Sequence, residues 1–145
     1  MKFFVTGVNG QLGHDVMNEL HSRGHEGVGS DIQDVYSGVA DGTAVTTMPY
    51  VKLDITDANA VREVISNVKP DAVIHCAAWT AVDLAEEKED LVRKVNVDGT
   101  ANIANVCKEL DCKMLYLSTD YVFNGLGAGT YICGKGNRTT RHFPV

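Results

Sequence analysis

The feature that most constrains the fold is the stretch Lys2–Gly13. An apolar, β-prone run ends at Thr6, and Gly7, Gly10 and Gly13 follow at a spacing of three before an amphipathic helical pattern begins. A strand, a glycine turn and a helix in this order provide what a dinucleotide pyrophosphate site requires, because the helix N-terminus offers backbone N–H groups to an anion. The alternative interpretation is an ordinary strand–turn–helix with chance glycines.

Each glycine of this turn has its own expected role. Gly7 is expected to take the tight turn, Gly10 to let the backbone approach the phosphates, and Gly13 to let the helix pack closely on the strand. The pattern is Gly-x-x-Gly-x-x-Gly and not Gly-x-Gly-x-x-Gly. It therefore points to one branch of the dinucleotide-binding proteins.

Length and composition fit one globular domain, with 145 residues of which 44% are hydrophobic and 22% are charged. Every apolar run falls short of the roughly 20 residues that a membrane span needs, and the apolar start continues into a glycine turn as a buried strand would. The net charge of −6 disfavours a nucleic-acid surface. We therefore expect a cytoplasmic protein with neither a membrane nor a nucleic acid as partner.

Cysteines and histidines predict neither a disulfide framework nor a metal site. The four cysteines form no Cys-x-x-Cys pair, and Cys76 and Cys107 are expected to be small buried hydrophobic residues. His21 and His25 lie four residues apart, but Gly24 ends the first helix between them and no third ligand is near.

Strand and helix patterns alternate along the chain, which predicts an α/β fold: a Rossmann-like, doubly wound parallel sheet that stops after about five strands. A connection over residues 32–50 shows no periodicity. Within the last helix, Gly99 indicates a bend or a close neighbour, and Asn96 must be hydrogen-bonded if it is buried. Strands are expected at residues 2–6, 25–30, 51–53, 72–76 and 114–117, and helices at 11–23, 57–68 and 86–110.

Polar residues follow several of these strands, at the sheet edge where such folds bind ligands. Asp31 can accept hydrogen bonds from the adenosine ribose and would repel the 2′-phosphate of NADP, so NAD is favoured; a solvated loop carboxylate is the alternative. Asp54 and Ile55 suit the adenine end, or a plain helix entry. The hydroxyls and the carboxylate of residues 118–120 indicate chemistry more than packing.

Four segments in order resemble the extended short-chain dehydrogenases, and more closely the dTDP-4-dehydrorhamnose reductase family. The resemblance covers residues 1–125, which we expect to form an NAD(P)-binding Rossmann domain. It implies that a 4-keto nucleotide sugar is reduced with NADH or NADPH. The segments are Thr6–Gly13, Ala77–Asp83, Val95–Thr100 and Ser118–Gly125.

The resemblance also implies roles for single residues. Thr119 would polarise the substrate carbonyl, Asp120 would contact the substrate, and Asn96 would have a structural role through water. Residues matching the family's cofactor contacts extend from the glycine turn to the end of the fifth strand. They are Gly7, Gly10, Gln11, Leu12, Gly13, Asp31, Asp54, Ile55, Ala78, Trp79, Thr80 and Leu117.

The family pattern departs after Gly125. Relatives continue to a Tyr-x-x-x-Lys helix, whose tyrosine protonates the carbonyl oxygen while the lysine lowers the pKa of that tyrosine. Tyr131 and Lys135 match this spacing, but Tyr131 lies only 12 residues after Thr119 and Gly134 disfavours a helix. We interpret the match as a coincidence.

Residues 126–145 are accordingly expected to be a truncated or frame-shifted tail, with the substrate-binding lobe absent. The leading hypothesis is the cofactor-binding half of a reductase, inactive or nearly so. Two alternatives remain: a non-catalytic dinucleotide-binding or regulatory module, and a nucleotide-sugar epimerase or dehydratase. The sheet edge that a missing half would leave exposed favours a homodimer or poor stability.

Overall fold

The computed structural model describes residues 1–85 and 87–118. Predictions for Thr119, Asp120, Tyr131, Lys135 and the tail 126–145 lie outside the described residues.

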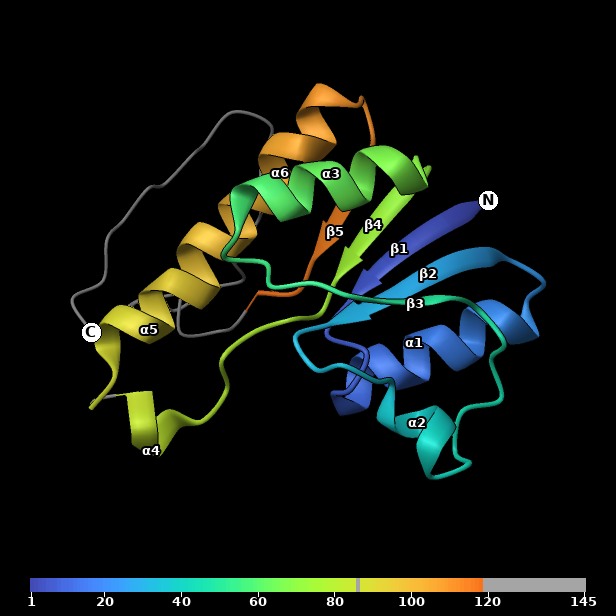
Figure 1. Ribbon diagram of the computed structural model, residues 1–145, viewed down its shortest axis with the longest axis horizontal. Helices are drawn as coiled ribbons and strands as arrows, with labels where there is room; N and C mark the ends of the chain where they lie inside the picture. Colours follow the sequence, from blue (N-terminus) through green and yellow to red (C-terminus); the bar gives the residue numbers. More distant parts are fainter. Residues whose placement is uncertain (86, 119–145) are drawn as a thin grey trace, which may run out of the picture.

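A five-stranded parallel sheet forms the centre of the molecule, with the strand order β3-β2-β1-β4-β5 (Figure 1). Every neighbouring pair is parallel, and β1 is flanked by β2 and β4. This arrangement confirms the predicted Rossmann-like α/β class. The strands are β1 (Lys2–Thr6), β2 (Glu26–Asp31), β3 (Tyr50–Lys52), β4 (Ala72–His75) and β5 (Lys113–Tyr116).

Helices cover both faces of the sheet, with α1 and α2 on one side and α3 and α6 on the other (Figure 1). Within the described residues, none of the helices is long and apolar enough to cross a lipid bilayer. The helices are α1 (Gln11–Ser22), α2 (Ser37–Ala40), α3 (Ala58–Val68), α4 (Val82–Ala85), α5 (Glu89–Arg93), the π-helix η1 (Lys94–Gly99) and α6 (Thr100–Glu109).

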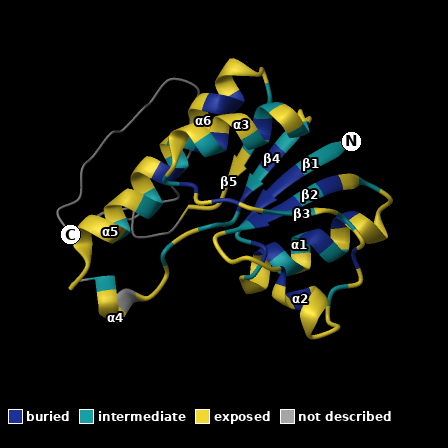
Figure 2. Cartoon of the chain, viewed as in Figure 1, coloured by how far each residue is buried: buried dark blue, intermediate teal, exposed yellow. Residues whose placement is uncertain are grey.

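Alternate residues of β1 enter two separate cores, because successive side chains of a strand point to opposite faces. Phe4 packs with Ile65 and Ile103 beneath α3 and α6, while Val5 packs with Met17 beneath α1. All five side chains are fully buried. Figure 2 shows buried and half-buried residues along β1 and β4 and on the inner helix faces, beneath exposed outer helix faces.

Two predicted segments differ from the structure only in part. The segment expected to be irregular contains α2, and it is held on α1 by Asn18, whose side-chain oxygen accepts hydrogen bonds from the backbone N–H groups of Val45 and Thr46 at 3.0 and 3.3 Å. The helix expected over 86–110 is a continuous helical run over residues 89–109, in which the π-helix η1 lies between α5 and α6, and α4 is a separate turn before it.

Gly99 explains where this helical stretch packs most closely. A Cβ atom at Gly99 would lie 2.7 Å from the Cδ1 atom of Ile55, so a larger residue there would require the Ile55 side chain to shift. This is the close neighbour that the mid-helix glycine indicated. Cys107 is buried as expected, whereas Cys76 is only half-buried.

Candidate functional site

The glycine turn between β1 and α1 is fixed by backbone contacts that exclude larger residues. Gly7 has a left-handed φ of 73°, and a Cβ there would lie 2.6 Å from the backbone nitrogen of Ala77. A Cβ at Gly13 would lie 2.2 Å from the carbonyl oxygen of Gly7. Gly7 thus lets the turn pass the loop after β4, and Gly13 lets α1 start directly against the turn.

The N-terminus of α1 has the properties of an anion site. Gly10 is the N-cap residue and offers no side chain to the first helical N–H groups, and the first turn contains no acidic residue. Gln11 and Leu12 are exposed there. The backbone N–H groups and the positive end of the helix dipole are therefore available to a phosphate.

Asp31 ends β2 beside the glycine turn. One carboxylate oxygen accepts a hydrogen bond from the backbone N–H of Asn9 at 3.0 Å, and the other accepts one from Ile32 at 2.8 Å. An ionised carboxylate has about four acceptor positions, so two remain for hydroxyl groups. The half-buried Asp31 is thus tied to the turn, although the alternative of a loop carboxylate was open from the sequence.

Asn9 is a structural member of this site that the sequence interpretation missed. Its side-chain oxygen accepts hydrogen bonds from the N–H and the hydroxyl of Ser37 at 2.8 and 3.0 Å, and its amide donates to the carbonyl of Val35 at 3.1 Å. It therefore joins the glycine turn to the loop before α2. An amide residue between the first two glycines was the available signal.

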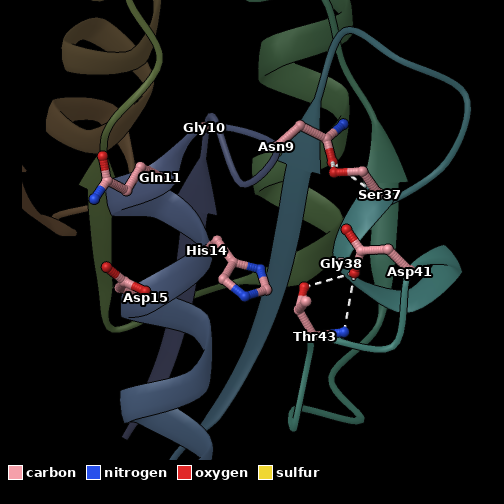
Figure 3. A pocket seen from close by; sticks show the side chains of 9 residues that line it. All are labelled: Asn9, Gly10, Gln11, His14, Asp15, Ser37, Gly38, Asp41 and Thr43. Carbon is pink, nitrogen blue, oxygen red and sulfur yellow. Dashed lines mark hydrogen bonds between the residues drawn. The ribbon is translucent and has the colours of Figure 1, made fainter.

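A pocket of about 180 Å³ lies where these two segments meet (Figure 3). Its volume is below the roughly 300 Å³ at which small-molecule pockets begin, so it borders the open surface of the turn and does not enclose a dinucleotide. Figure 3 shows Asn9 directed at Ser37, and Asp41 bonded to Thr43. The first turn of α1 and residues 37–43 supply the lining.

The loop after β4 approaches the glycine turn from the other side. Asn96 of η1 holds this loop at two points: its side-chain oxygen accepts from the N–H of Trp79 at 2.7 Å, and its amide donates to the carbonyl of Trp79 at 3.2 Å. Ala78 and Thr80 on either side are exposed. The structure thus gives Asn96 a direct backbone contact, where a role through water was expected.

His75 sits beneath this loop and was given no role from the sequence. Only 1% of its surface is exposed, and its ring nitrogens contact the hydroxyls of Thr6 at 2.7 Å and Thr100 at 3.1 Å. Thr6 also accepts the N–H of Ala77 at 3.2 Å. All groups are paired if the Thr6 hydroxyl donates to Nδ1 and Nε2–H donates to Thr100. Burial lowers the pKa of His75 to about 4, so the ring is neutral.

The remaining expected cofactor contacts differ in their surroundings. Asp54 is exposed and accepts the N–H of Thr56 at 2.9 Å, as a helix entry would, while Asp57 caps α3. The side chain of Ile55 is buried in the core against Gly99, so only the backbone of Ile55 could contact an adenine. Leu117 is 42% exposed just after β5. Within the described residues, no cluster of three or more side chains could hold a metal ion.

Sheet order, glycine turn and the polar carboxyl edge of the strands define a Rossmann-like α/β protein. More narrowly, the chain belongs to the family described as the RmlD substrate binding domain, whose model matches residues 1–135. This agrees with the resemblance that the sequence motifs carry.

Three known proteins show the extent of the similarity. A dTDP-4-dehydrorhamnose reductase of Streptomyces griseus is 38% identical over 90% of this chain and 37% of its own length. The crystal structure of such a reductase from Clostridium acetobutylicum is 36% identical with a TM-score of 0.72, covering 90% of this chain and 40% of that one. Another, from Bacillus anthracis in complex with NADP, is 33% identical with a TM-score of 0.69, covering 88% and 39%. The chain spans about two fifths of the length of these relatives.

Proposed function

We propose that this chain binds the ADP portion of NAD(H) or NADP(H) across its glycine turn, as the cofactor-binding part of a reductase for a 4-keto nucleotide sugar. The observation that carries the proposal is the uncapped N-terminus of α1, which follows a turn that only glycine permits at Gly7 and Gly13. The Bacillus anthracis relative, solved with NADP, supports the choice of ligand.

Different residues of the site contact different parts of the cofactor. Backbone N–H groups at Gln11 and Leu12 hold the pyrophosphate, and the free acceptor positions of Asp31 take the ribose hydroxyls. Asp54 and the backbone of Ile55 border the adenine. The loop Ala77–Thr80, fixed by Asn96, lines the nicotinamide side, with Leu117 behind it.

The carboxylate of Asp31 makes NAD(H) the preferred cofactor. A second phosphate on the 2′-oxygen would lie against this carboxylate and be repelled by it, whereas two hydroxyls can both donate to it. The preference of the chain for NAD(H) over NADP(H) is thus determined by Asp31 at the end of β2.

Reduction of a carbonyl needs a hydride, which the bound nicotinamide supplies, and a proton donor at the oxygen. Thr119 and Asp120 are the proposed substrate contacts. Tyr131 and Lys135 are too close to Thr119 in sequence, and too rich in neighbouring glycine, to serve as the catalytic pair. We therefore infer that residues 1–125 bind the cofactor and that Tyr131 and Lys135 do not form the proton-donating pair.

Calorimetric titration of the 145-residue protein with NADH, followed by a dTDP-4-keto-sugar reduction assay, tests both parts. We expect saturable NADH binding and no turnover at ordinary enzyme rates. Normal turnover by this polypeptide would contradict the exclusion of Tyr131 and Lys135, and Tyr131→Phe would then show whether Tyr131 supplies the proton. The absence of NADH binding would contradict the cofactor assignment itself.

A further inference from the structure

Two charged side chains beyond Asp31 lie at the same corner of the sheet and take no part in the site described above. Lys52 is the register partner of Asp31 on the neighbouring strand β3, so their Cα atoms are about 4.8 Å apart and both side chains leave the same face of the sheet. The Lys52 ammonium donates to the carboxylate of Asp34 at 2.6 Å.

No other basic residue occurs near Asp31 in the surrounding sequence. Residues 26–36 contain no lysine, arginine or histidine, and residues 50–57 contain Lys52 alone. Lys52 is therefore the basic residue that the strand register places beside Asp31 and beside any 2′-phosphate bound there. The side chains of Lys52 and Asp34 are 58% and 85% exposed, so the pair can part without burying an uncompensated charge.

The pair also sits on a loop that β3 holds in place. The hydroxyl of Tyr50 donates to the carbonyl of Gln33, and the backbone N–H of Leu53 donates to the carbonyl of Asp31 at 2.8 Å. Because Gln33 is anchored in this way, the neighbouring Asp34 stays within reach of Lys52 without depending on the ion pair for its position.

We propose that Asp34 is a specificity-determining residue, which disfavours a 2′-phosphorylated cofactor by occupying and neutralising Lys52. This inference rests on the proposed dinucleotide site. With Asp34 in place, the corner presents two carboxylates and one ammonium. Removal of the Asp34 charge leaves Lys52 to pair with the 2′-phosphate and offset the repulsion from Asp31.

The test compares binding of NAD⁺ and NADP⁺, which differ only in the 2′-phosphate, to the full chain by calorimetry. Asp34→Asn is expected to tighten NADP⁺ binding about three- to tenfold and to leave NAD⁺ binding within about twofold. The gain is expected to shrink at high ionic strength, because exposed charges are screened.

Two further variants make the result specific. Asp34→Asn combined with Lys52→Gln is expected to lose the gain, since the cation is then absent. Glu19→Gln is the matched control, because it breaks another exposed ion pair of 2.6 Å, between Glu19 of α1 and Arg23 just after it, and removes the same charge. An unchanged NADP⁺-to-NAD⁺ ratio in Asp34→Asn, or a gain that persists without Lys52, overturns this inference alone. Failure of the unmodified chain to bind either nucleotide overturns the proposed function as well.

Discussion

Gly7 and Gly24 share a left-handed backbone but differ in what surrounds them. Their φ angles are 73° and 69°. A Cβ at Gly7 would press on the backbone of Ala77, whereas a Cβ at Gly24 would meet nothing within 4 Å. The two positions therefore separate the cost of an unfavourable φ from the cost of a steric clash.

Gly24→Ala is expected to lower the free energy of unfolding by about 1 to 2 kcal/mol, the cost of a left-handed residue with a Cβ. Gly7→Ala should cost roughly 3 kcal/mol or more, because the turn or the loop after β4 must also shift. Urea unfolding followed by tryptophan fluorescence measures both. Equal losses for the two variants would show that the contact with Ala77 is not restrictive.

Among single residues, the roles of the glycines in the turn were predictable from the sequence and the role of Asn9 was not. A glycine requirement can be expected from spacing between a strand and a helix, because few other residues permit the turn. The role of Asn9 depends on where Val35 and Ser37 return to the turn, more than 25 residues later. Local pattern contains no information about that return.

The π-helix η1 is the element that connects the core to the loop after β4. It brings Gly99 against Ile55 and directs Asn96 to both backbone polar groups of Trp79. Wide helical turns of this kind are often found at functional sites. Trp79 is the single tryptophan of the chain, so its emission reports on this loop.

Asn96→Ala is expected to release the Trp79 loop and to cost about 1 to 3 kcal/mol of stability, because two backbone hydrogen bonds are lost. Quenching of Trp79 fluorescence by acrylamide should increase in this variant. Asn102→Ala is the control: it removes one hydrogen bond, to the carbonyl of Ile55 at 2.9 Å, without touching the loop. Similar quenching in the two variants would argue against a specific clamp.

Elements in which the apolar pattern repeats over several turns were predictable, and short or irregular elements were not. The alternation of strands with α1 and α3 follows from apolar spacing that one face of each element must bury. The helix α2 has four residues, too few to show a period. An α-helix and a π-helix place apolar residues at similar local spacings, so η1 could not be distinguished from its flanking helices.

Across the whole molecule, stability is expected to depend on pH through His75. Its pKa is about 4 in the folded chain against an ordinary value of 6.5, because burial disfavours the charged ring. Between these values the unfolded chain binds more protons than the folded one. Stability is therefore full above pH 6.5 and declines as the pH falls toward 4, by up to roughly 3 kcal/mol.

Urea unfolding at a series of pH values measures this loss, and His75→Gln is expected to flatten the profile in that window. His21→Gln, at an exposed histidine near the end of α1, should leave the slope unchanged. A profile that is equally steep with and without His75 would assign the acid sensitivity to carboxylates instead.

The class of the sheet was predictable at this scale, but the burial of its last strand was not. Residues 114–117 were expected to form a strand, with no statement about its burial, and Leu115 and Tyr116 of β5 are 58% and 46% exposed. Periodicity identifies a strand but gives no account of what packs outside it. The expected homodimer stays a prediction for the same reason.

The central position of β1 has a consequence for how the chain is made. During synthesis, β1, α1 and β2 can assemble as a unit once Asp31 has emerged from the ribosome. The other edge of β1 pairs with β4, and the bond between Thr6 and His75 joins residues 69 positions apart. Until His75 emerges, a nascent chain presents an unpaired apolar strand edge, which is the kind of surface that chaperones bind. The separation of β1 from β4 therefore sets how long this edge of β1 stays unpaired during synthesis.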